Sequence, residues 1–141
     1  VLVHSFHNPV KTPHMKKIIT TDKAPAPVGP YNQAIVHNDT LYASGQIAID
    51  PATGSLVTET IEAETRQVME NIKAILTEAG LGFGDVIKCS VFVTDMNNYS
   101  RINAVSAEYF DEYTAPAREL VEVRNLPKFV NVEISVIAAF A

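Results

Sequence analysis

The chain has a single cysteine and no tryptophan among its 141 residues. One cysteine cannot form an internal disulfide, which excludes the disulfide-rich secreted domains and is typical of a reducing compartment. We therefore expect a cytoplasmic protein. The neighbours of Cys89, in "VIKCSVFV", predict a small residue inside a strand. A reactive thiol is disfavoured because no base accompanies it in the sequence.

Positive charge is also scarce. The 11 Lys and Arg residues stand against 16 Asp and Glu, which gives a net charge of −5 and a pI near 5.3. Nucleic-acid-binding surfaces are basic, and no basic or aromatic stripe is present, so we expect no nucleic-acid partner. Charged residues make up 19% and hydrophobic residues 47% of the chain. This balance excludes disorder and predicts that some apolar surface is buried between subunits.

Long hydrophobic runs are missing: none approaches the ~20 residues that a membrane span requires, and no membrane partner is expected. The first fourteen residues lack the apolar segment and cleavage site of a signal peptide. Met15, followed by "KKIITTDKAPAP", has the form of a natural start. We interpret residues 1–14 as an N-terminal extension, either added for expression or native upstream sequence, and residues 15–141 as one domain. Three of the four histidines fall in this extension, namely His4, His7 and His14. Without further ligands on a rigid element they predict no metal site.

Hydrophobic periodicity predicts two helices and several strands. Strands are expected over 16–20, on both sides of Asn38-Asp39, and over 85–95, 118–124 and 130–140, and helices over 61–79 and 97–113. Gly80 is expected to close the first helix in a left-handed conformation. The order β-ββ-α-β-α-ββ predicts an α+β domain with two helices packed on one face of a mixed sheet. The other face is expected to be rich in Val, Ile and Ala, and a symmetric oligomer would cover it.

Motifs for metal, phosphate or serine chemistry are absent from the sequence. "GLGFG", at 80–84, lies between a helix and a strand, whereas a phosphate loop lies between a strand and a helix. What remains is a set of polar residues in apolar surroundings, and Arg118 in "PAREL" is the most distinctive. A guanidinium presents a rigid fork of donors that matches a carboxylate. The alternative is an ordinary strand-end cation paired across the sheet with Glu133 or Glu122.

Glu133 is the second candidate. In "VNVEISV" the apolar Val132, Ile134 and Val136 alternate with polar residues, so Glu133 points away from the Val-Ile face. If its face is exposed to solvent, Glu133 is an ordinary surface residue. If that face lines an intersubunit cleft beside Arg118, Glu133 is a candidate for orienting water and moving protons. The sequence leaves both open.

Four further residues are weaker candidates. Tyr31 follows "VGP", a rigid turn that would fix a phenol at a pocket rim, although such a tyrosine more often packs on a sheet edge. Asn103 interrupts an apolar helical stripe, which usually indicates a satisfied hydrogen bond between helices or subunits. Ser44 and Gly45 end a strand in "YASGQIAID". Glycine there permits close backbone approach to a ligand, and a β-bulge explains it equally well.

Taken together, these segments resemble the Rid family of reactive intermediate deaminases, also known as the YjgF or L-PSP endoribonuclease family. The resemblance covers about 15–141 and rests on ordered blocks: "APVGPYNQA", "ASGQIAIDPATG", "NIKAILTEAG", "DVIKCSVFVTDMNNYSRINAVSAEYF", "PAR" and "EVRNLPKFVNVEI". The closing pattern, "PAR" with a strand, then "LPK" and a "VEI" strand, is specific to the family.

The resemblance implies a chorismate-mutase-like fold and a homotrimer with ligand sites between subunits. It implies hydrolysis of 2-imino acids, such as 2-iminobutanoate and 2-iminopropanoate, to 2-oxo acids and ammonia without a cofactor. These imines arise from pyridoxal-phosphate dehydratases, which implies a functional link to those enzymes. Carried over by position, Arg118 would bind the substrate carboxylate and Glu133 would handle water and protons. The other matching residues are Tyr31 at the pocket wall, Ser44 and Gly45 in its floor, and Asn103 reaching across the interface.

Two departures from the family pattern concern the pocket. The family commonly has small residues, often Ser and then Cys, after "PAR", where this chain has Glu119 and Leu120. Strand alternation places Leu120 on the face of Arg118, so we expect it to line the pocket and either to narrow it or to alter the substrate preference. The stretch "YFDEYTA" before "PAR" is also shorter than in many members of the family, which predicts a reshaped loop at the mouth of the cleft. Two other functions stay open: a non-catalytic, carboxylate-binding regulator of a partner enzyme, and, disfavoured by the acidic charge, a ribonuclease or translation inhibitor.

Overall fold

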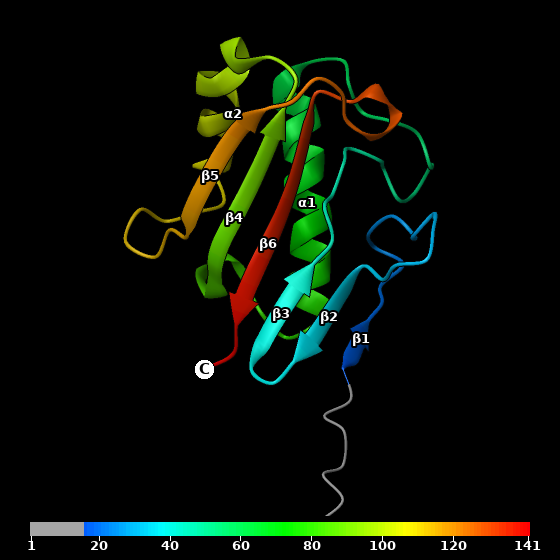
Figure 1. The fold of residues 1–141 in the computed structure, drawn as a ribbon, viewed down its shortest axis with the longest axis vertical. Helices are drawn as coiled ribbons and strands as arrows, with labels where there is room; N and C mark the ends of the chain where they lie inside the picture. The colour runs from blue at the N-terminus through cyan, green and yellow to red at the C-terminus, as the bar shows by residue number, and fades with distance from the viewer. Residues whose placement is uncertain (1–15) are drawn as a thin grey trace, which may run out of the picture.

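The computed structural model describes residues 16–141 and contains one mixed sheet with helices on one side (Figure 1). The six strands lie in the order β1-β2-β3-β6-β4-β5. Their bounds are β1 Lys17–Ile19, β2 Ala34–His37, β3 Thr40–Ala43, β4 Val86–Val93, β5 Ala117–Glu122 and β6 Val132–Ala139. The predicted order of strands and helices is confirmed. The interpretation of residues 1–14 and their histidines lies outside the described residues.

The sheet is mixed because one strand, β5, runs parallel to its neighbour while the others pair antiparallel. The strands β1, β2, β3, β6 and β4 pair antiparallel, and β2 and β3 form the predicted hairpin around Asn38, which has a φ of 53°. β5 pairs parallel with β4 and forms one edge of the sheet. A parallel neighbour requires a crossover, and the second helix, α2 (Tyr99–Ser106), provides it. Arg118, near the start of β5, therefore lies at a sheet edge beside that helix.

Helix α1 (Ile61–Glu78) agrees closely with its prediction. The Thr60 side chain caps its start by accepting a hydrogen bond from the Ala63 backbone, and Gly80 follows its end with a φ of 78°. The apolar residues predicted for its inner face are buried, among them Val68 and Ile72. This helix supplies much of the hydrophobic core behind the sheet.

Helix α2 is shorter than predicted. The expected helix over 97–113 ends at Ser106, and a 3-10 turn, Met96–Asn98, precedes it. After Ser106 the backbone changes to a 3-10-type turn, because the Tyr109 backbone N–H donates to the Ser106 carbonyl three residues earlier. This turn places Tyr109 and Phe110 against Phe83, with ring centroids 5.3 and 5.2 Å away. Aromatic packing thus overrides the helical spacing of the sequence.

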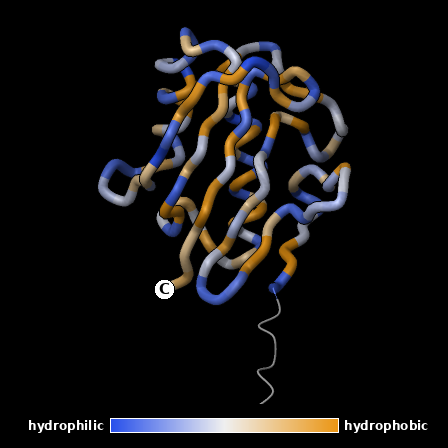
Figure 2. Tube along the Cα trace, in the orientation of Figure 1, coloured by the Kyte–Doolittle hydropathy of each residue, from blue (hydrophilic) through white to orange (hydrophobic). Residues whose placement is uncertain are grey.

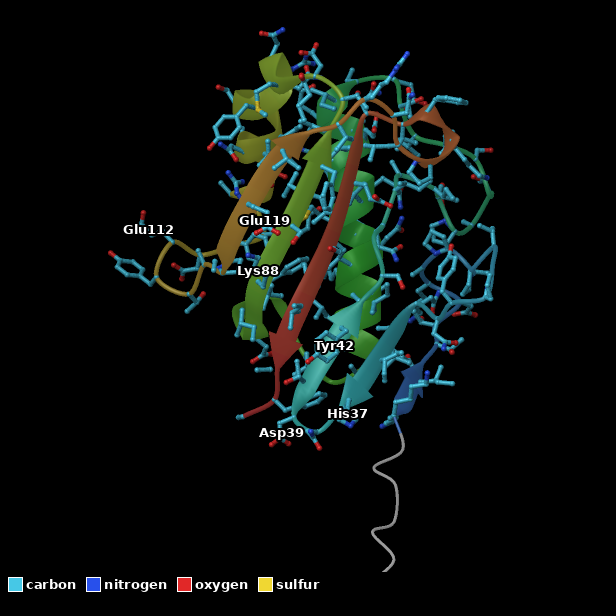
Figure 3. The ribbon with its side chains drawn as sticks, in the orientation of Figure 1. His37, Asp39, Tyr42, Lys88, Glu112 and Glu119 are labelled. Carbon is cyan, nitrogen blue, oxygen red and sulfur yellow. The ribbon has the colours of Figure 1, made fainter. Side chains whose placement is uncertain are left out.

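The two faces of the sheet differ in composition. On the helix side every second residue of β6 is buried, as predicted from the Val-Ile alternation. The open face, turned towards the viewer in Figure 2, is less uniformly apolar than expected. Exposed or half-buried Ile and aromatic residues are present, but Lys88 and Glu119, labelled in Figure 3, form a polar cluster with Ser90 within it. Glu119 accepts from the Ser90 hydroxyl at 2.8 Å and pairs with Lys88.

Candidate functional site

Arg118 is held by two side chains of α2. Its Nη1 donates to Oδ1 of Asn103 at 2.6 Å, and its Nη2 donates to the Tyr99 hydroxyl at 3.2 Å. The guanidinium carbon lies 5.7 Å from the centroid of the Tyr99 ring. These contacts fix the orientation of the fork and leave other N–H groups for a ligand, because a guanidinium has five donors.

The alternative pairing of Arg118 with a cross-strand carboxylate is wrong. Among residues 16–141 no carboxylate forms an ion pair with Arg118. Glu122 instead accepts from the Met96 backbone N–H at 2.8 Å. Glu133 lies on the other face of the sheet, as the strand register below establishes. Arg118 is therefore a cation with neutral hydrogen-bond partners, and an anionic ligand would complement it.

A hollow of about 230 Å³ opens beside Arg118, between α2 and the start of β5. Cys89, Asn103, Phe110 and Pro116 contribute to its lining. Burial raises the pKa of the Cys89 thiol to about 11, and the nearby Arg118 only partly offsets this. The thiol is therefore protonated at neutral pH, in agreement with its interpretation as a small strand residue.

Tyr99 is a member of this group that the sequence analysis did not single out. Hydrogen bonding with Asn103 and the charge of Arg118 lower the pKa of its phenol. The available signal was spacing, because Tyr99 and Asn103 are four residues apart and so share one face of a helix. Asn103 was expected to reach across a subunit interface; within the chain its amide oxygen binds Arg118.

Glu133 belongs to a second hollow, of about 130 Å³, together with Tyr31 and Gly45. Its side chain is half-buried, and this burial raises the pKa of its carboxyl. It packs directly on Gly45, where an added Cβ would lie 2.8 Å from Oε1 of Glu133. The Tyr31 hydroxyl accepts from the Val28 backbone N–H at 3.3 Å, and Tyr31 as a residue is 49% exposed at the rim. Gly45 thus makes room for a carboxyl group whose pKa is raised by its burial.

Ser44 and Leu120 have different surroundings from those expected. The Ser44 hydroxyl donates to the Asn32 carbonyl at 2.6 Å, which ties the end of β3 to the preceding loop. Leu120 shares the helix-side face with Arg118, as predicted, but it packs against the hydrophobic core. It contributes to neither hollow. Its side chain packs against the hydrophobic core of the chain, and the expectation that Leu120 lines a pocket between subunits stays a prediction.

The two hollows lie on opposite faces of the sheet. Arg118 is in register with Cys89, which is buried on the helix side, and Cys89 is in register with Val136. Glu133 lies three residues before Val136 in β6, and because successive side chains alternate between faces, its side chain is on the open face. Two strand spacings and three residues separate the Cα atoms of Arg118 and Glu133 by about 14 Å. A small acid bound by Arg118 therefore cannot reach Glu133 of the same chain.

No group of three or more metal-ligating side chains is present within residues 16–141. Over the same part of the chain, no helix is long and apolar enough to cross a bilayer.

The fold and the two hollows define a class: a small α+β protein with an arginine at one sheet edge that has only neutral side-chain partners, and a half-buried carboxyl group on the opposite face. Over residues 21–140 the chain matches the family model described as Endoribonuclease L-PSP. The chain belongs to this family, whose members also carry the name Rid. The resemblance inferred from the sequence blocks is confirmed, as is the α+β fold.

Similar proteins carry both general and specific names. A RutC family protein of Synechocystis is 53% identical over 123 residues, which cover 86% of this chain and 95% of that protein. The 2-iminobutanoate/2-iminopropanoate deaminase of Salmonella typhimurium is 47% identical over 126 residues, covering 88% of this chain and 98% of that protein. Among solved structures, Escherichia coli TdcF with bound serine has a TM-score of 0.83 at 42% identity, covering 89% of this chain and 99% of that one. The family thus includes named deaminases.

Proposed function

We propose that the protein hydrolyses 2-imino acids, such as 2-iminobutanoate and 2-iminopropanoate, to 2-oxo acids and ammonia. The reaction would take place at sites between the subunits of a homotrimer. The observation that carries the proposal is the arrangement of Arg118, which Asn103 and Tyr99 orient while no carboxylate of residues 16–141 neutralises it. The deaminase name of a relative at 47% identity supports the same chemistry.

Arg118 would bind the substrate carboxylate. Bidentate hydrogen bonds from a guanidinium fix both the position and the plane of a carboxylate. The bound serine of the related TdcF supports a small carboxylate ligand in this family, since serine carries one. Binding through arginine also explains how a chain with a net charge of −5 accepts an anionic substrate.

Glu133 would move protons. Its half-buried carboxyl group has a raised pKa, which brings it closer to neutral pH and suits general acid–base catalysis. As water attacks the imine carbon, the C–O bond forms, the C=N π bond breaks, and Glu133 takes one proton from the water. That proton then passes to the nitrogen. The C–N bond then breaks as Glu133 takes the proton of the new hydroxyl and passes it to the departing ammonia, so the products are a 2-oxo acid and ammonium. A protonated imine is already electrophilic, so positioning is the main requirement.

The opposite faces of Arg118 and Glu133 support a site shared by two subunits. One subunit would present the Arg118 side and its neighbour the side with Glu133, Tyr31 and Gly45. Substrate would come from pyridoxal-phosphate dehydratases, which release imines of this kind from serine and threonine. A cytoplasmic location agrees with that source and with the single cysteine.

The test is ammonia release from an imine generated in situ by a serine dehydratase, with the uncatalysed background subtracted. Wild-type protein should accelerate release, and Arg118→Ala should lower the rate by about a hundredfold or more, the scale for losing a preorganised charged contact. Arg118→Lys should recover only part of the lost rate, because an ammonium group lacks the planar fork of donors. Arg66→Ala is the matched control, since Arg66 pairs with Glu108 on the surface at 2.9 Å.

Other results would contradict the proposal. Near-full activity of Arg118→Ala would remove Arg118 from the site. A wild-type protein that binds a 2-oxo acid but releases no ammonia would favour the non-catalytic regulator. RNA cleavage that survives Arg118→Ala and rigorous purification would favour the ribonuclease.

A further inference from the structure

Glu64 is a fully buried carboxylate in the first turns of α1, with 0% exposure. Its Oε2 accepts from the backbone N–H groups of Asn131 at 2.7 Å and Val132 at 2.9 Å. Its Oε1 accepts from the Asn131 side-chain amide at 2.8 Å. All three donors belong to the two residues that directly precede Glu133. The contacts span 67 and 68 positions of sequence, so they tie the helix to the start of β6.

The backbone that leads into Glu133 is held by this contact together with the pairing of Val132 with Val93 of β4. A short 3-10 turn, Pro127–Phe129, precedes β6, and Lys128 and Phe129 in it have positive φ values of 54° and 56°. On the following side, Ile134 exchanges two backbone hydrogen bonds with Gln46, at 2.8 and 3.1 Å. Glu133 is thus bracketed between the Glu64 contact and the Gln46 bridge. Between these two points its side chain is pressed onto Gly45.

We propose that Glu64 is the positioning residue for Glu133. Its carboxylate fixes Asn131 and Val132, and through them the place where the Glu133 side chain leaves the backbone and packs on Gly45. The inference rests on the proposed function only for its effect on hydrolysis. Its structural part, the placement of Glu133, stands independently of any activity.

The chemistry of the contact predicts which substitutions preserve it. Glu64→Leu leaves three donors without an acceptor in a buried place, which favours displacement of the loop. Glu64→Gln retains one oxygen for the two backbone N–H groups, and its new NH₂ faces the Asn131 amide. Rotation of that amide by half a turn then presents its oxygen to the NH₂, so every hydrogen bond is restored. Asn131→Asp sets two carboxylates against each other, and Glu64→Gln combined with Asn131→Asp removes the repulsion.

The experiment measures steady-state hydrolysis, thermal stability and the titration of the Glu133 side-chain carboxyl carbon by NMR, on the full chain. Glu64→Leu and Asn131→Asp should lower kcat by about tenfold or more. KM should change by less than about threefold, because Arg118 lies on the other face. The pKa of Glu133 should fall towards that of an ordinary glutamate as its burial is lost. Glu64→Gln and the double variant should resemble wild type in all three measurements.

Val68→Ala is the structural control. Val68 is fully buried one turn further along α1, and its truncation lowers stability without removing a hydrogen bond to 131–132. It should leave kcat and the Glu133 titration unchanged well below its melting temperature. If Glu64→Leu does not fold, the comparison of Asn131→Asp with the double variant, Glu64→Gln combined with Asn131→Asp, decides the question.

The inference is overturned if folded Glu64→Leu or Asn131→Asp keeps both the kcat and the Glu133 pKa of wild type. It is also overturned if the double variant fails to recover what Asn131→Asp loses. A wild-type protein without imine hydrolysis would refute the proposed function instead, and the titration would still establish whether Glu64 places Glu133.

Discussion

A site shared between subunits predicts that two inactive variants restore each other. Arg118→Ala removes the guanidinium that would bind the substrate carboxylate, and Glu133→Gln removes the group that would carry protons on the opposite face of the sheet. Each variant alone should lose about a hundredfold or more in rate. In a cyclic oligomer with such a shared site, each site would take Arg118 from one chain and Glu133 from its neighbour. Random mixing in equal amounts should therefore leave about a quarter of the sites with both residues intact, and recover about a quarter of the wild-type activity.

The assay is ammonia release after the two variants are unfolded together and refolded, with native mass spectrometry to establish that mixed oligomers form. The matched control mixes Arg118→Ala with a chain that carries both substitutions. That mixture contains no intact Arg118 and should stay inactive. If mixed oligomers form and activity does not recover, both residues act within one chain, and the geometric argument from the separation of about 14 Å is wrong.

Three further predictions follow from the contacts around the two hollows. Because burial raises the pKa of Glu133, its carboxylate form destabilises the fold as pH rises through that pKa. Glu133→Gln should therefore raise the melting temperature at pH 7, and the difference should shrink towards pH 4, where wild type is protonated; equal melting temperatures at pH 7 would contradict this. Gly45→Ala brings a Cβ to 2.8 Å from Oε1 of Glu133, so it should lower kcat while retaining the fold. Gly82→Ala, with no atom within 4 Å of its added Cβ, is the control for circular dichroism and rate. Cys89, with a pKa of about 11, should react with iodoacetamide at pH 8 only after denaturation, and rapid labelling of the native protein would refute its burial.

Local patterns in the sequence were sufficient for most of the secondary structure. The spacing of apolar residues and Gly80 predicted α1 and its end, and the alternation of "VNVEISV" placed Glu133 away from the core. These patterns work because each depends on neighbours a few positions away, on one face of a helix or strand. The end of α2 could not be predicted this way, since the packing of Tyr109 and Phe110 on Phe83 decided it.

The site residues divide in the same manner. The amino-acid order is enough to show that the chain carries the family blocks, with an arginine after "PA" and a glutamate in the last strand. What those residues contact follows from the folded chain: Asn103 and Tyr99 hold Arg118, Leu120 packs against the core, and buried Glu64 binds the backbone before Glu133. The parallel register of β5 with β4 also decided that Arg118 and Glu133 face opposite ways. The physical reason is that strand alternation is local, whereas the side of the sheet on which an edge strand presents its side chains depends on its pairing with a strand about thirty residues away.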